Sequence, residues 1–269
     1  MKIRIKFEKT GPVRFVGHLD FQRTFQKILK KSSLEPVYTS GFNPHIVLSF
    51  AVPLGVGEET LGDYADVEFA YRDFGELDEQ EKYRLSDIGL DNDALPAPPV
   101  EADFLNAFNE AAPEGIKAVS AVRVGVIKHS KAGALVRNAA FRIYLKDGFL
   151  SDLDGPMLET CLHAFVSQES IRVKKVTKSG EKVTDIRPLI GRVLAENGCS
   201  TPAGGNFGTG RVIMLECAQG SARNLKPGVF LEALSAYVGA NYDPSGCRIR
   251  RIDLFDENMT PLSELGEHF

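Results

Sequence analysis

The sequence predicts an α+β fold made of two tandem ferredoxin-like (split βαβ) domains with half-open antiparallel sheets. Segments with an alternating apolar pattern, typical of strands, are interleaved with segments of helical periodicity. The order strand, helix, strands, helix, strand occurs twice along the chain, which is the ferredoxin-like order. The length of 269 residues is sufficient for two domains of ordinary size.

The first predicted domain spans residues 1–128. From Lys2 to Phe7 apolar and basic residues alternate, which predicts a strand buried on one side, with Lys2, Arg4 and Lys6 on its open side. A helix follows over residues 18–33, because apolar residues recur at helical spacing and Pro36 stops the pattern.

The rest of this domain contains three strands, a helix and a closing strand. Acidic residues dominate 72–100, which ends in Pro-Ala-Pro-Pro, so we expect a partly mobile surface insertion there. Pro113 ends the next helix. The predicted elements are strands at 36–39, 46–53 and 63–71, a helix at 101–112, and a strand at 115–126.

The second predicted domain spans residues 136–257 and repeats the order of the first. Residues 258–269 are expected to form a C-terminal tail. The elements are a strand at 137–146, a helix at 154–168, strands at 171–176, 183–195 and 207–217, a helix at 227–238, and a strand at 247–255.

Composition excludes several classes of protein. The hydrophobic fraction is 43% and the charged fraction 25%, as in ordinary globular proteins. Met1 is followed by a charged segment, and no window approaches the roughly 18 apolar residues of a membrane span. The four cysteines lie far apart, without zinc or redox spacing. We therefore expect a cytoplasmic protein with reduced cysteines, no metal, no cofactor and no membrane partner.

Charge is segregated along the chain, although the net charge is only −4. Residues 1–31 contain nine Lys or Arg against two acids, whereas residues 62–114 contain fifteen acids against three cations. The chain can thus carry a local basic surface for an anionic partner. The alternative is that these charges form ordinary solvated faces.

Two tight loops, each with a histidine, flank the helix predicted at 18–33. The second combines Gly41 with Asn43-Pro44, a strong turn signal. If residues 36–39 run parallel to the first strand, the two loops meet at one end of the sheet. The side chains expected to converge there are those of Arg14, His18, Asn43 and His45.

His18 and His45 are the candidates for catalysis. Two imidazoles can act as acid and base in RNA cleavage or in proton transfer. The alternative is that His18 caps its helix beside Asp20 and His45 hydrogen-bonds within its turn. Because no third group that would orient them is evident, we favour the structural interpretation over catalysis, and binding without chemistry stays open.

An open sheet face offers another possibility. Lys2, Arg4 and Lys6 could contact phosphates, and Tyr144 on the second domain's first strand could stack a base. The alternative is that the other domain covers these faces. A glycine-rich stretch at residues 204–211 could bind phosphate, although such stretches are more often hairpin connections.

Several motifs stand out along the chain. The early ones are Thr10-Gly11-Pro12 with Phe15, His18-Leu19-Asp20, and the stretch from Gly41 through Phe42 and Asn43 to His45. The later ones are Arg187-Pro188, Asn224-Leu225-Lys226-Pro227 and Arg250-Arg251-Ile252. Together these motifs resemble the radical SAM-linked protein family, an uncharacterised bacterial group. The chain departs from the family at Gly17, where Ser is usual, and at Ile46-Val47, where Pro-Lys is common.

The resemblance implies a radical SAM protein as partner. This chain lacks the Cys-x-x-x-Cys-x-x-Cys run that holds an iron–sulfur cluster, so it is not expected to be the radical enzyme. We therefore expect an accessory module, without activity of its own, that recognises RNA or an RNA-linked substrate. The alternatives are an RNA-acting, metal-independent enzyme that uses His18 and His45, and a protein–protein docking module. The candidate binding residues are Lys2, Arg4, Lys6, Arg14, His18, Asp20, Phe42, Asn43, His45, Arg187, Asn224 and Lys226.

Overall fold

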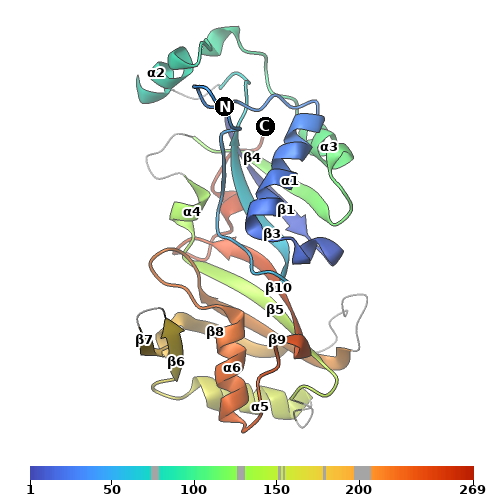
Figure 1. The fold of residues 1–269 in the computed structure, drawn as a ribbon, viewed down its shortest axis with the longest axis vertical. Coiled ribbons are helices and arrows are strands. Elements are labelled where there is room, and N and C mark those ends of the chain that lie inside the picture. Colours follow the sequence, from blue (N-terminus) through green and yellow to red (C-terminus); the bar gives the residue numbers. More distant parts are fainter. Residues whose placement is uncertain (74–78, 126–130, 151–152, 154, 178–179, 197–206) are drawn as a thin grey trace. The chain divides into compact units, whose positions relative to one another are not determined.

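The computed structural model is a mixed α+β structure with mostly antiparallel strands (Figure 1). It describes residues 1–73, 79–125, 131–150, 153, 155–177, 180–196 and 207–269, and these contain six α-helices. The chain forms two compact units: unit 1 comprises Met1–Val136 and Leu254–Phe269, and unit 2 comprises Arg137–Asp253. The predicted Gly-rich loop before residue 207 lies outside the described residues.

Unit 1 is built on strands paired in the order β4-β1-β3-β2. β3 pairs antiparallel with β1, opposing Ile3 to Val67 and Phe7 to Asp63. The predicted strand at 36–39 is reduced to isolated bridges, Pro36 to Phe69 and Tyr38 to Ile46. The elements are β1 (Lys2–Lys9), α1 (His18–Lys31), β2 (Leu48–Phe50), β3 (Glu59–Glu68), α2 (Glu79–Asp87), α3 (Glu101–Ala111), β4 (Ile116–Arg123) and α4 (Ala132–Leu135).

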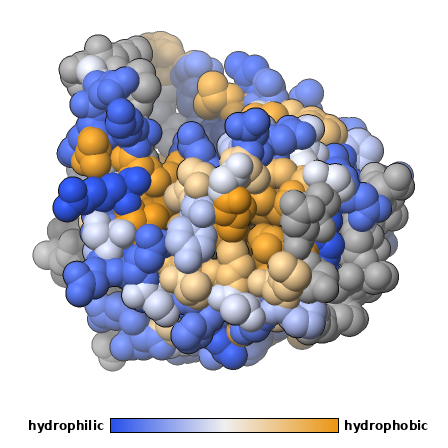
Figure 2. All heavy atoms as spheres, turned by 90° about the horizontal axis from the view of Figure 1, so that it is seen from below, coloured by the Kyte–Doolittle hydropathy of each residue, from blue (hydrophilic) through white to orange (hydrophobic). Residues whose placement is uncertain are grey.

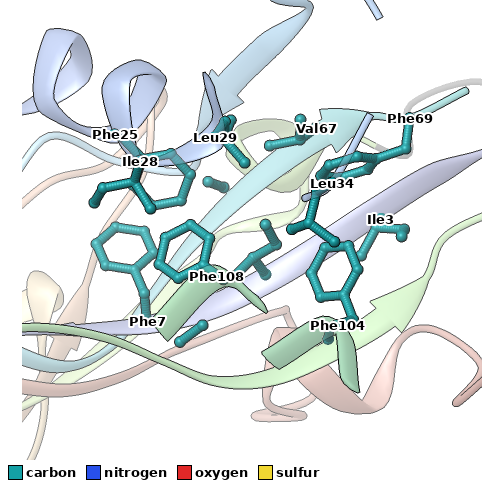
Figure 3. Packing of buried hydrophobic residues seen from close by; sticks show 14 of the residues in the cluster. Ile3, Phe7, Phe25, Ile28, Leu29, Leu34, Val67, Phe69, Phe104 and Phe108 are labelled. Atoms are coloured by element: carbon teal, nitrogen blue, oxygen red, sulfur yellow. The ribbon is translucent and has the colours of Figure 1, made fainter. Parts of the chain in front are cut away.

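The core of unit 1 lies between its sheet and the helices α1 and α3 (Figure 3). Aromatic rings fill much of it: the Phe25 and Phe108 ring centroids lie 5.1 Å apart, and those of Phe69 and Phe104 are also 5.1 Å apart. These contacts explain the helical spacing of the apolar residues in α1, whose buried side is Phe21, Phe25, Ile28 and Leu29.

The opposite face of β1 is not open at Arg4, contrary to the sequence-based expectation. Arg4 is 1% exposed, and its guanidinium donates to both carboxylate oxygens of Asp66, at 2.8 and 3.2 Å, and to the carbonyl of Leu262. The backbone N–H of Ala132 also donates to Asp66. A charged residue at an outward position of β1 is thus buried because β3 supplies its counter-ion.

The C-terminal residues 258–269, expected as a tail, belong to unit 1. Leu262 is buried, and the backbones of Arg123 and Glu267 exchange hydrogen bonds at 2.7 and 2.9 Å. The carbonyl of Phe269 accepts from the N–H of Glu101 at the start of α3. This segment therefore covers polar side chains of unit 1 that the sequence pattern alone assigns to solvent.

The acidic insertion after β3 contains a helix, α2, that the sequence pattern did not predict. The N–H of Arg72 donates to the carbonyl of Pro96, and Asp73 and Asn92 are joined by two hydrogen bonds between backbone and side-chain amide. The two ends of the insertion are thereby held together. Residues 74–78 lie outside the described residues.

Unit 2 repeats the strand order, as β10-β5-β9-β8. The segment predicted as one strand at 183–195 is divided: its first part forms a separate hairpin with β6, and its second part joins the sheet as β8. The elements are β5 (Asn138–Lys146), α5 (Gly155–Val166), β6 (Arg172–Thr177), β7 (Gly180–Asp185), β8 (Ile190–Glu196), β9 (Phe207–Ala218), α6 (Pro227–Tyr237) and β10 (Cys247–Phe255).

Tyr144 of β5 is also buried, so the expected stacking platform is not available in unit 2. The side chain is 2% exposed, and the guanidinium of Arg250 lies 5.6 Å from its ring centroid. Its neighbour Arg142 makes a two-pronged ion pair with Glu196 at 2.7 and 2.9 Å. In unit 2, the charge of Arg142 is therefore neutralised by a neighbouring strand of the same unit.

Candidate nucleic-acid interface

The first histidine loop is a short 3-10 turn, Gly11–Phe15, that ends one strand and starts α1. Gly11 has φ +65°, and Arg14 donates to its carbonyl at 2.9 Å. The Arg14 guanidinium also lies 4.4 Å from the centroid of the exposed Phe15 ring and 3.7 Å from Glu59. Arg14 thus fixes its own loop and has limited freedom to bind a ligand.

His18 lines a small hollow together with Lys9 and Asp63. Its ring packs edge-on against Phe50, with centroids 5.6 Å apart. Lys9 is 3% exposed, and its ammonium donates to the carbonyl of Val16 at 2.8 Å. Burial lowers the Lys9 pKa, although the carboxylates of Asp63 and Glu58 oppose this shift. The hollow has room for about one water, so it is not a ligand cavity.

The second histidine loop is the tip of a hairpin, residues 39–45. The N–H of Thr39 donates to the carbonyl of His45 at 2.8 Å, and the N–H of His45 donates to the Thr39 hydroxyl at 3.0 Å. Gly41 has φ +107°, which favours glycine at this turn. These bonds hold the tip in place, while Phe42 is fully exposed and Asn43 is exposed as well.

The two histidines do not converge. His18 shares its hollow with Asp63 of β3, whereas the segment just after His45 pairs at the other end of β3, where Val47 accepts from the N–H of Glu68. Asp63 and Glu68 are five residues apart on β3, which corresponds to roughly 17 Å at about 3.4 Å per residue. The expectation of a His18–His45 pair is therefore wrong, because the hairpin lies at the opposite end of the sheet.

The C-terminal half of α1 carries a basic stripe made of Lys27, Lys30 and Lys31. All three side chains are exposed, and none makes an ion pair with a residue that the structure describes. The spacing of three and four residues places them on one face of the helix. The ammonium of Lys30 lies 5.9 Å from the ring centroid of Tyr38, which joins the stripe to the hairpin.

Other candidates in unit 1 have local partners. Asp20 makes an exposed ion pair with Arg23 at 3.0 Å. The Lys6 ammonium lies 5.8 Å from the ring centroid of Tyr64. Lys2 lines a cavity of about 280 Å³ together with Asp66 and Glu68.

The three candidates in unit 2 lie in two adjoining turns. Arg187 donates to the carbonyl of Ile190 at 3.2 Å, and Asn224 accepts from Gln219 at 3.1 Å. Arg223 bonds the carbonyl of Pro188, which joins the two turns. Lys226 is exposed and precedes the first residue of α6. The structure thus brings these basic residues together, in turns that the sequence separates by more than thirty positions.

Sequence reasoning missed Lys9 and Tyr38. By strand alternation, Lys9 lies on the same inward side of β1 as Ile3, Ile5 and Phe7. A cation at an inward position of the strand was therefore the available signal. Tyr38 gave no such signal, because its exposure depends on the hairpin geometry.

In the described ranges of the chain, no three His, Cys, Asp or Glu side chains are grouped so that they could hold a metal ion. Within the same ranges, every helix is too short or too polar to cross a bilayer.

A family model described as an uncharacterized protein conserved in bacteria (DUF2344) matches residues 2–85 and 93–227. This match includes the first histidine loop, the hairpin and the basic stripe. No curated protein matches the chain.

Proposed function

Because the chain belongs to the bacterial family DUF2344, whose description gives no activity, we propose a function from its geometry. We propose a cytoplasmic accessory module that binds single-stranded RNA and presents it to a radical SAM partner. The partner follows from the resemblance of the sequence motifs, and the RNA from the surface formed by the hairpin and α1. We further propose that both units are ferredoxin-like, which the repeated strand order supports.

The observation that carries the RNA proposal is the exposure of Phe42 at the tip of a fixed hairpin. A large exposed aromatic side chain is costly in water, and its hairpin holds it away from the core. An aromatic ring stacks any base, with about 1–3 kcal/mol lost per base on substitution by alanine. Tyr38, at 39% exposure, offers a second ring on the same hairpin.

The basic stripe supplies the charges that RNA requires. Lys27 and Lys31 are four residues apart, so their like charges repel by a few tenths of a kcal/mol on an isolated helix. The helix dipole offsets part of this cost at the C-terminal end. An RNA phosphate would remove the rest, and the contact of Lys30 with Tyr38 places phosphate and base sites side by side.

The test is fluorescence anisotropy of the purified chain with a labelled twelve-nucleotide RNA of mixed sequence, at several salt concentrations. Phe42→Ala should weaken binding about 5- to 150-fold, which corresponds to about 1–3 kcal/mol. Tyr83→Ala is the matched control, because Tyr83 is 74% exposed on α2, outside this surface. Equal effects of the two substitutions would reject the hairpin as a binding site.

A second pair of variants tests the charges. Lys27→Glu with Lys31→Glu should weaken binding and reduce its salt dependence. Lys117→Glu with Lys131→Glu changes net charge equally at two other exposed positions of unit 1, and should have a smaller effect. Absence of RNA binding by the unmodified chain at low salt would refute the proposal and favour the protein-docking alternative.

A second candidate function is an RNA-acting enzyme centred on His18, favoured by the buried Lys9 and Asp63 beside it. A lysine with a lowered pKa next to a carboxylate is typical of catalytic sites as well as of structural ion pairs. If the chain cleaves RNA, His18→Ala should abolish turnover, whereas His45→Ala should not. Full turnover by His18→Ala would eliminate this candidate.

A further inference from the structure

A cavity of about 410 Å³ lies within unit 2, between the helices α5 and α6 and strand β6. Its size is within the range of small-molecule sites, about 300–1,000 Å³. Figure 2 shows hydrophobic side chains gathered on the face of unit 2 seen from below in Figure 1. The lining residues used below are Phe165, Arg172, Lys174, Glu232, Ala236 and Tyr237.

One wall of the cavity is aromatic. The rings of Phe165 and Tyr237 pack with centroids 5.4 Å apart, tilted by 58°. Phe165 is buried, but Tyr237 is 46% exposed, so part of its ring is available to a ligand. Ala236, which also lines the cavity, adds only a methyl group to this wall. This wall fits a flat, partly apolar group.

The wall formed by β6 is cationic. Arg172 and Lys174 are two residues apart on the strand, so their side chains leave the same side of it. Both are exposed, and neither makes an ion pair with the residues that the structure describes. Asp185 stands opposite Arg172 across the β6–β7 hairpin and attracts it, but the carboxylate mainly accepts the backbone N–H groups of Ile171 and Arg187. The two cations therefore form a site for an anionic group.

Glu232 is the acidic residue of the lining. It lies on α6, as Tyr237 does, whereas the two cations lie on β6. A carboxylate accepts hydrogen bonds from an exocyclic amine, as on adenine or cytosine. The cavity thus has an aromatic wall with an acceptor and a second wall with two cations.

We infer that this cavity binds a nucleoside monophosphate unit, with its base beside Tyr237 and Glu232 and its phosphate at Arg172 and Lys174. A bare anion would leave the aromatic wall in water, and a purely apolar ligand would leave the cations unused. The nucleotide can be a free mononucleotide or the 5′-phosphorylated end of an RNA. The inference does not rest on the RNA surface proposed for unit 1.

The experiment measures the affinity of the full chain for AMP by isothermal titration calorimetry. Arg172→Gln with Lys174→Gln should weaken AMP binding at least tenfold and leave adenosine binding unchanged. The matched control, Lys182→Gln with Arg192→Gln, removes two exposed charges of unit 2 outside the cavity and should leave AMP binding intact. Tyr237→Leu should weaken both AMP and adenosine, because it removes the ring and keeps apolar bulk.

Competition assays identify the source of the nucleotide. Displacement of AMP by a 5′-phosphorylated oligoribonucleotide, but not by its 5′-hydroxyl form, assigns the site to RNA ends; no displacement by either assigns it to free nucleotides. Equal binding of AMP and UMP would overturn the contact assigned to Glu232. Three outcomes would overturn the inference. They are the absence of AMP binding, competition by inorganic phosphate as strong as that by AMP, and an unchanged AMP affinity in the Arg172 and Lys174 double variant. Phe42→Ala should not affect AMP binding, which separates this site from the surface in unit 1.

Discussion

Replacement of Arg4 by methionine should destabilise unit 1 severely. The guanidinium is 1% exposed and makes two hydrogen bonds with the Asp66 carboxylate and one with the carbonyl of Leu262. Methionine fills similar space without charge, so Asp66 would stay buried without its counter-ion. The N–H of Ala132, which donates to Asp66 at 2.7 Å, would still bind the carboxylate.

Loss of one partner of a buried ion pair costs about 3–5 kcal/mol, because the other charge stays desolvated. We therefore expect Arg4→Met to lower the free energy of unfolding by that amount. Adding Asp66→Leu removes the unpaired buried charge and should recover part of the lost free energy of unfolding. A deficit of about 1–3 kcal/mol should persist, since the N–H of Ala132 then loses its acceptor.

Urea unfolding followed by circular dichroism measures the total effect. Because the chain has two units, hydrogen exchange of the β1 and β3 peptides is needed to assign the change to unit 1. Arg23→Met is the control: the Asp20–Arg23 pair is exposed and should be worth less than about 1 kcal/mol. A loss for Arg4→Met no larger than for the control would refute the buried-pair argument.

Three further predictions concern single residues. In urea unfolding, Gly115→Ala should lower the free energy of unfolding more than Gly148→Ala. Both glycines have φ +87°, but only a Cβ at Gly115 would meet a backbone oxygen, at 2.5 Å. Equal losses of unfolding free energy would contradict this clash. Lys9 has a pKa lowered by burial, so unfolding stability should rise with pH between the folded-state value and about 10.5, a rise that Lys9→Met should abolish in the same assay. Burial raises the pKa of Glu101, but hydrogen bonds from Ala121 and His268 lower it by more. The net result is a pKa below 4.5. The stabilisation by Glu101 should be lost as pH falls through that value, and Glu101→Gln should show a flatter acid-unfolding curve.

Local patterns in the sequence determined most of the helices and strands. Apolar spacing and stop signals located α1, α3 and α6 to within two residues at each end, and β10 at its observed bounds. The same patterns failed at the acidic insertion, because α2 has little apolar periodicity to reveal it. They also merged β7 and β8, since an apolar pattern does not show which strand a segment will pair with.

For the candidate site, the sequence identified the two histidine loops and the basic character of residues 1–31, but not their arrangement. Phe42 and the residues around it were found from turn chemistry, which depends on neighbours in the chain. The separation of His18 from His45 depends on strand register, and the burial of Arg4 depends on Asp66, sixty-two residues away. A residue's own pattern gives its preferred side of a strand, whereas its exposure is set by distant segments that pack on that side, so only the tertiary structure decided which cations are available to a partner.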